Sequence, residues 1–282
     1  MSIRRPCQAG SFYSGKTSSL RKEIEECFLN ELGPEKIPKP SHNALTSVVG
    51  LVAPHAGYMY SGSIATHSYF ALAMDGTPDC AIIIGPNHTG LGSGVSIMDK
   101  GIWVTPLGEI SIDANIANQI CKNYDLIDID EKAHQYEHSI EVQIPFLQYL
   151  YGKKLQFVPI CMMMQDLETS VELGKAIARS IYNKNIIVIA SSDMTHYESG
   201  QLASRKDKKA INAILKFDET ELFKIVESER ISMCGYGPII STITCSKKLG
   251  ASKAELLSYK TSGDVTGDHS SVVGYASIIF KR

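Results

Sequence analysis

Four short apolar runs constrain the fold of this chain more than any other feature of its sequence. Each run is rich in valine and isoleucine and is bounded by polar or turn residues, which is the pattern of strands that are covered on both faces. The runs are 47–53, 80–85, 155–160 and 185–190. We therefore expect four buried strands in one sheet.

Helical stretches precede and separate these runs. The candidates are 19–32, 64–74 and 166–182, and Asp166 is placed to cap the last of them. Strands that alternate with helices predict an α/β fold, in which a central, largely parallel sheet is flanked by helices in layers. Such a sheet binds ligands beyond the carboxyl ends of its strands, so the residues directly after each run are the candidates for a site.

Two further segments predict antiparallel strands. Residues 91–112 have alternating apolar positions broken by glycines and Pro106 and predict an antiparallel hairpin or excursion, while 255–263 and 271–281 predict two strands around a loop over 263–271. Residues 37–46 are expected to form a loop that is too short and too early to separate domains. The sequence contains no internal repeat, and we expect a single domain over 1–282.

Charge and cysteine content narrow the class of protein. The chain has 282 residues and a formal net charge of −2, so no general field would attract nucleic acid or an acidic membrane. No apolar run approaches the roughly 20 residues of a membrane span, and we expect a cytoplasmic protein. Seven scattered cysteines without a C-x-x-C pair argue against a disulfide framework and against structural zinc.

Histidines follow the first, second and fourth of the four apolar runs. The residues at these strand ends are His55, then Asn87 and His88, then Asp193 and His196. His55 and His88 lie about one βαβ unit apart, and sequential strands are neighbours about two-thirds of the time. Neighbouring strand ends, about 4.8 Å apart, would let the two imidazoles share a metal ion. Alone, each histidine could equally be a turn residue, and Asp193 could cap the next helix.

Two other clusters carry candidate site residues. Glu137 and Glu141 flank His138 and have the i,i+4 spacing of one helical face. Two like charges there require a cation or a donor between them, unless they form a solvated helix end. Cys234 precedes a glycine at the expected start of a helix, where the pKa of a thiol falls and the thiolate forms readily.

His55, His88 and Cys234 together form a borderline-soft ligand set. Such a set suits iron, copper or zinc rather than magnesium or calcium, and three protein ligands leave coordination positions open, as in catalytic sites. We therefore expect a divalent metal ion, with iron favoured and copper or zinc as the other candidates. His196 is the expected acid or base, and Asp193 is expected to orient an imidazole.

Several motifs, taken together, resemble the Memo family. They run in consistent order over nearly the whole chain and are RRPCQAGSFYSG, APHAGYMYSG, GPNHTG, WVTPLGE, EHSIEVQIPFL, SSDMTHY, MCGYGPI and SSVVGYAS. The resemblance implies a fold like that of the class III extradiol ring-cleavage dioxygenases, with one active-site cleft. It also implies metal ligation by His55, His88 and Cys234, and it places His196 like the dioxygenase catalytic histidine, with Asp193 beside it.

The resemblance leaves the reaction open. A thiolate in place of the dioxygenases' carboxylate ligand alters the redox behaviour of a metal and can itself oxidise. Animal members of the family resemble metal-binding proteins that act in redox chemistry and recognise phosphorylated receptor tails. Microbial members are often encoded beside a radical-SAM protein and an AMMECR-type protein, which implies a shared pathway.

Three functions stay open on the sequence. The first is a metal-dependent redox or oxygenase-like protein that acts on a small molecule or peptide. The second is a metal-free hydrolase or transferase with Cys234 as nucleophile, His196 as base and Asp193 as its orienting partner. The third is a binding module that keeps the cleft without its chemistry. The substrate-binding candidates are Tyr58, Asn87, Glu137, His138, Glu141 and Tyr236.

Overall fold

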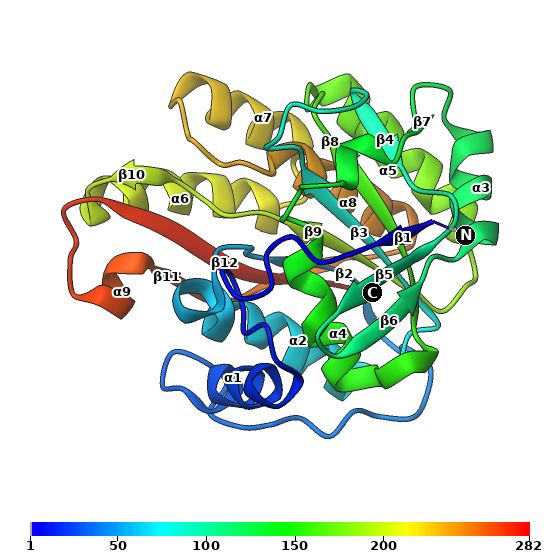
Figure 1. Cartoon of the computed structure of the whole chain (residues 1–282). Helices are drawn as coiled ribbons and strands as arrows, with labels where there is room; N and C mark the ends of the chain where they lie inside the picture. The colour runs from blue at the N-terminus through cyan, green and yellow to red at the C-terminus, as the bar shows by residue number, and fades with distance from the viewer. Residues whose placement is uncertain (1) are drawn as a thin grey trace.

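A large mixed sheet with helices on both faces forms the body of the protein (Figure 1). The computed structural model describes residues 2–282. Within this range the strands of the sheet are β2 (Val48–Ala53), β3 (Cys80–Pro86), β4 (Val95–Ile97), β7 (Asp128–Ile129), β8 (Gln156–Met162), β9 (Ile186–Ser191), β10 (His196–Glu198), β11 (Lys253–Thr261) and β12 (Val272–Lys281). Their order is β10-β12-β2-β9-β3-β8-β4-β7, and β11 pairs with β12. The predicted α/β layered fold is confirmed.

The four predicted strands form the centre of this sheet. β2, β9, β3 and β8 lie side by side and parallel, and Ile189 of β9 pairs with Leu51 on one side and with Ile83 on the other. The outer strands are not all parallel, because β12 runs antiparallel to β2 and β4 runs antiparallel to β8. The carboxyl ends of the four central strands therefore share one edge.

Helices cover both faces of the sheet. They are α1 (Thr17–Leu29), α2 (Ser63–Asp75), α3 (Ala114–Asn123), α4 (Ile144–Tyr151), α5 (Leu167–Ile181), α6 (Gly200–Leu215), α7 (Glu219–Ser228), α8 (Tyr236–Lys248) and α9 (Ser262–Thr266). Figure 1 shows α1, α2 and α4 on one face and α5, α6 and α8 on the other. The predicted helices are confirmed as α1, α2 and α5, and the carboxylate of Asp166 caps α5 by accepting the Thr169 N–H. No helix within residues 2–282 combines the length and apolarity needed to cross a membrane.

Short turns and a small second sheet complete the structure. The helical turns are η1 (Tyr58–Gly62), η2 (Lys132–His134), η3 (Glu141–Gln143) and η4 (Gly152–Lys154). The small sheet joins β1 (Ile3–Arg4) to the hairpin of β5 (Ile102–Thr105) and β6 (Gly108–Ser111). This hairpin and the antiparallel pair of β11 and β12 confirm the strands expected in both segments. Residues 37–46, all described, form the expected loop.

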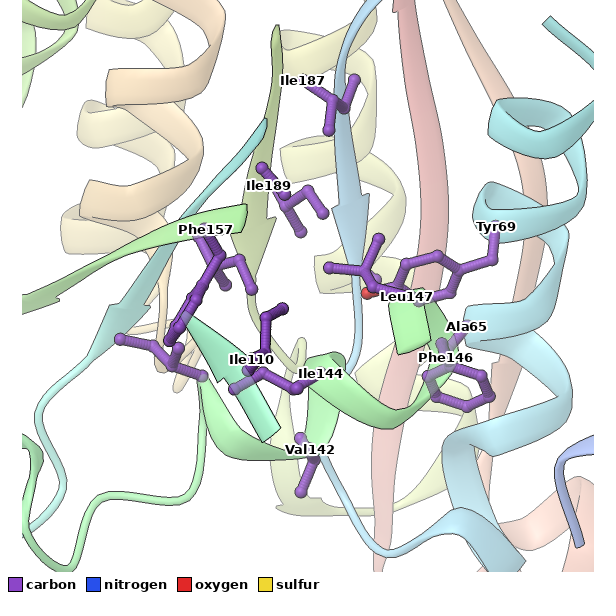
Figure 2. Close-up of a cluster of buried hydrophobic side chains, with 14 of the residues drawn as sticks. Ala65, Tyr69, Ile110, Val142, Ile144, Phe146, Leu147, Phe157, Ile187 and Ile189 are labelled. Atoms are coloured by element: carbon purple, nitrogen blue, oxygen red, sulfur yellow. The ribbon is translucent and has the colours of Figure 1, made fainter. Parts of the chain in front are cut away.

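Successive residues of the central strands are buried on opposite faces of the sheet. Leu51 and Ile189 join one apolar cluster, which includes Tyr69 of α2, and Figure 2 shows Ile189 and Tyr69 in it. Val52 and Val188 point the other way, into the clusters beneath α5, α6 and α8. Burial on both faces explains why these strands read as continuous apolar runs rather than as alternating ones.

Removal of side-chain volume from the centre of the sheet should lower stability sharply. Ile189 is 0% exposed, whereas Ile129 on β7 is 56% exposed. We expect Ile189→Ala to reduce the free energy of unfolding by about 2–5 kcal/mol, because it leaves a cavity. Ile129→Ala, the matched control, should cost less than about 1 kcal/mol. Urea unfolding followed by circular dichroism would measure both, and equal losses would contradict this account of the core.

Candidate metal centre

A cavity of about 470 Å³ lies beyond the carboxyl ends of the central strands. Four histidines line it, together with the carboxyl group of Asp193; they are His55, His88, His138 and His196. This is the edge at which the sequence predicts a site. The described lining residues include aromatic rings but no lysine or arginine.

Three of these histidines form a tight cluster. One ring nitrogen from each of His55, His88 and His138 lies within 4.8 Å of the others, which is a spacing that could hold a metal ion. The His88 and His138 rings stack at a centroid distance of 4.4 Å, and His55 meets both edge-on. Burial lowers the pKa of His55 well below its usual value and that of His138 to about 4, so both are neutral at pH 7.

His55 and His88 come together by a route that differs from the expected one. β9 lies between β2 and β3, so the expected adjacency of the first two strands is wrong. Each histidine lies two residues beyond the end of its strand, and the His55 ring reaches Ser191 at the end of β9. The loops thus bridge the intervening strand, and the two ring centroids lie 5.3 Å apart.

Glu137 holds two of the clustered imidazoles. Its carboxylate accepts the Nδ1–H of His88 at 2.9 Å and lies 3.4 Å from Nδ1 of His138, and it also accepts the backbone N–H groups of His88 and Ser139. Burial is the largest single effect and acts to raise the pKa of Glu137, but the hydrogen bond from His88, the charges of His88 and His138 and the N–H of Ser139 together outweigh it and lower the pKa to about 2. Glu137 therefore lies behind the imidazoles as an anion, rather than in the cavity.

Cys234 lies beside this cluster. Its Sγ is 3.2 Å from Nε2 of His55 and accepts the backbone N–H of Asp193 at 3.3 Å. The expectation of a readily formed thiolate is wrong for the protein without metal, because burial and the neighbouring Asp193 raise the pKa of the thiol. The residue does precede α8, as expected, but the N-terminus of that helix does not outweigh these two effects.

His196 and Asp193 occupy the cavity without contacting each other through a hydrogen bond. Nδ1 of His196 bonds to the carbonyl oxygen of Ser232 at 2.8 Å, and because a carbonyl only accepts, Nδ1 carries the proton; Nε2 keeps its lone pair and has no hydrogen-bond partner among residues 2–282. The Asp193 carboxylate accepts the backbone N–H of His55. Burial raises the pKa of Asp193 to about 6. Asp193 is not a helix cap, because α6 begins at Gly200 with Ser199 before it.

Glu141 lies away from the cavity and anchors the N-terminal segment. The expected helical face is wrong, because Glu137 precedes η3, and neither carboxylate is solvated. The Glu141 carboxylate pairs with Arg4 and accepts the backbone N–H of Cys7 and the hydroxyl of Tyr13. These contacts hold the N-terminal segment close to the site.

Three other predicted substrate-binding residues also lie outside the cavity lining. Tyr58 is buried and donates its hydroxyl to the carbonyl of Val142. The Asn87 side chain closes the turn that follows β3, where it accepts the N–H of Thr89. Tyr236 lies at the start of α8 and packs near Phe223. Each of these side chains has a structural contact that its place in a motif does not reveal.

Sequence reasoning missed several residues of the site. Phe12 lines the cavity and contacts the His138 ring at a centroid distance of 4.9 Å, although it lies far from every strand end. Gln143 and Ser191 form a buried polar cluster behind His55. A glutamine inside the otherwise apolar stretch 142–147 was the available signal for this cluster.

An α/β protein with three imidazoles gathered beyond one edge of its sheet is the class that the fold and site define. The chain belongs to the Memo family, since the family model described as Memo-like protein matches residues 4–279. It is 50% identical to a MEMO1 family protein of Methanopyrus kandleri over 281 residues, which cover 99% of each chain. It is also 50% identical to a MEMO1 family protein of Sulfolobus acidocaldarius, again over 99% of both.

One solved structure is similar in fold. It is an uncharacterized protein of Escherichia coli K12, with a TM-score of 0.53 and 12% sequence identity. The similarity covers 82% of this chain and 99% of that one. At this identity the likeness supports the layered α/β fold alone.

Removal of Arg4 should destabilise the protein because it leaves the buried Glu141 carboxylate without a cation. We expect Arg4→Met to lower the free energy of unfolding by about 3–5 kcal/mol. The exposed neighbour Arg5 supplies the control, and Arg5→Met should cost less than about 0.5 kcal/mol. Chemical denaturation at pH 7 would compare them.

The cost of Arg4→Met should also depend on pH. Burial acts to raise the pKa of Glu141, but Arg4 and the hydrogen-bond donors lower it below its unfolded value. Its stabilisation is therefore present above the unfolded pKa of about 4.3 and is lost as the pH falls further. The stability difference between wild type and variant should narrow below that pH, and a difference that stays constant down to pH 3 would contradict this role of the pair.

Proposed function

We propose that this protein binds a divalent metal ion at the histidine cluster and uses it in redox or oxygenase-like chemistry. Iron is favoured, and copper or zinc are the other candidates. The gathering of His55, His88 and His138, with one ring nitrogen of each within 4.8 Å, carries the proposal. Neutral imidazole is a ligand for all three metals, and burial keeps two of these rings neutral.

The donor set fits such an ion. His55 and His88 belong both to the predicted ligand set and to the cluster, and His138 supplies a third imidazole. The Cys234 thiol, beside His55, is the further ligand that the sequence predicts. A bound iron or copper ion would supply one-electron redox chemistry to a substrate in the cavity.

The surrounding side chains have separate tasks in this proposal. Glu137 orients His88 and His138, as carboxylates commonly do for metal-bound imidazoles. His196 can accept or return a proton at its free Nε2. Phe12 and Tyr197 give the cavity apolar surface, and with no lysine or arginine among the described lining residues the best fit is a small, uncharged molecule.

The metal-free hydrolase fits the geometry less well. Its nucleophile Cys234 lies beside His55 rather than beside His196, and Asp193 bonds to a backbone N–H instead of to the His196 ring.

A binding module is supported by the exposed rim of the cavity, where Met59 is 70% and Tyr197 is 80% exposed. A pathway shared with radical-SAM and AMMECR-type proteins stays a prediction.

Metal content tests the proposal directly. Protein purified without oxygen should hold iron, copper or zinc in near-stoichiometric amount, and the double variant His55→Ala, His88→Ala should lose most of it, because two ligands are gone. His42→Ala, at an exposed histidine in the loop 37–46, should retain it. Elemental analysis by mass spectrometry measures all three. Equal metal content in wild type and double variant would overturn the proposal, and single His138→Ala and Cys234→Ala variants would rank the third ligand.

Alkylation separates the metal site from the cysteine hydrolase. In the metal-free protein, iodoacetamide should modify Cys234 more slowly than a small-molecule thiol, because burial and Asp193 raise the pKa of Cys234. Added zinc should slow the alkylation of Cys234 further. It should leave the alkylation rate of Cys7 unchanged, because Cys7 lies against Glu141, away from the histidine cluster. Peptide mass spectrometry gives both rates. Rapid modification of Cys234 that zinc does not change would favour the nucleophile instead.

A further inference from the structure

A buried polar cluster lies behind His55, on the side away from the cavity. It consists of the Ser191 hydroxyl, the Gln143 amide and the Ser139 carbonyl, and all three residues are 0% exposed. Ser191 ends β9, and Gln143 ends η3, so the cluster joins the sheet edge to the segment that carries His138. None of the three lines the cavity.

The hydrogen bonds of Ser191 determine where its proton lies. A hydroxyl has one hydrogen to donate and two lone pairs that accept. The carbonyl oxygen of Ser139, 2.6 Å from Ser191 Oγ, can only accept, so the hydroxyl hydrogen points to it. The Gln143 Nε2 group, at 2.7 Å, donates to one lone pair. One lone pair is left, and it faces Nδ1 of His55 at 2.9 Å.

The orientation of the Gln143 amide is itself determined by its partners. Its Nε2 also donates to the Pro54 carbonyl at 2.9 Å, and its Oε1 accepts the hydroxyl of Tyr69 at 2.7 Å. A flipped amide would place its oxygen against the Pro54 carbonyl oxygen and would lose that bond. Gln143 is therefore a donor toward Ser191.

We propose that Ser191 is a positioning residue that holds His55 with its proton on Nδ1 and so presents the Nε2 lone pair to the metal site. Because Nδ1 of His55 faces the remaining lone pair of the Ser191 hydroxyl, that nitrogen must donate. Nε2 then accepts, which matches its 3.2 Å contact with Cys234 Sγ, where the thiol is the donor. That the Nε2 lone pair of His55 binds a metal rests on the proposed function, but the position of the proton on Nδ1 does not.

Ser191 performs for His55 the task that Glu137 performs for His88. Both acceptors bind Nδ1 at 2.9 Å, but only Glu137 carries charge. Asp193 is already buried beside His55, where it accepts the backbone N–H, and a second carboxylate there would repel it. A neutral hydroxyl orients the ring without adding charge to that side of the cavity.

The tautomer can be read in the metal-free protein. Long-range proton–nitrogen correlation spectra of histidine labelled with nitrogen-15 distinguish a protonated Nδ1 from a protonated Nε2, and a His55→Gln spectrum assigns the signals. In wild type at pH 7.5 we expect the proton of His55 on Nδ1. In Ser191→Ala we expect a substantial population with the proton on Nε2, because a buried Nδ1–H would then lack an acceptor.

Matched variants separate this effect from a general loss of packing. Ser68→Ala removes another fully buried hydroxyl, which bonds to the Val52 carbonyl and to Ser277, and should leave the His55 tautomer unchanged. Ser191→Cys keeps nearly the same volume with a weaker acceptor and should give an intermediate population. If Ser191→Ala does not fold, Ser191→Cys decides the question.

The outcomes for the tautomer and for metal binding can be told apart. A wild-type proton on Nε2, or folded Ser191 variants whose tautomer is unchanged, would overturn the proposal. Competition with a chelator for zinc should show about 10–100-fold weaker binding in Ser191→Ala, the usual effect of removing a partner of a metal-bound histidine. If wild type binds no zinc while the tautomer shifts as expected, the metal function fails and the positioning role of Ser191 stands.

Discussion

The buried carboxylate of Glu137 is the contact on which the rest of the site depends. It binds the backbone and the ring of His88, which follows β3, and lies against His138 in its own segment. The Glu137 carbonyl accepts from the Arg4 guanidinium, which also pairs with Glu141 and so ties the N-terminal segment to the same loop. Glu137 thus connects parts of the chain that are far apart in sequence, through its backbone carbonyl and its carboxylate, and the carboxylate holds two imidazoles in fixed orientations.

The site gathers imidazole nitrogens with little added charge. Burial keeps His55 and His138 neutral, so the rings approach one another without repulsion. Glu137 and Ser191 each occupy an Nδ1 and leave an Nε2 for the cavity, one as an anion and the other as a neutral hydroxyl. Membership of the Memo family and this geometry together fit a metal site.

Much of the fold and part of the site could be predicted from local sequence. The four central strands were predictable because burial on both faces leaves a continuous apolar run, and Asp166 because a helix cap is a local contact. His55 and His88 were predictable as strand-end residues. Glu141 was misplaced because its partner Arg4 is 137 positions away, and the expected Cys234 thiolate did not account for burial beside Asp193.

The sequence alone determined the layered α/β fold and the edge of the sheet at which a site must lie, because both follow from periodicity and chain direction. Only the tertiary structure decided the order of the strands, with β9 between β2 and β3, and the meeting of His138 and Phe12 with the strand-end histidines. It also decided which ring nitrogens are free. These properties depend on hydrogen-bond partners and burial supplied by distant segments, and no local pattern encodes them.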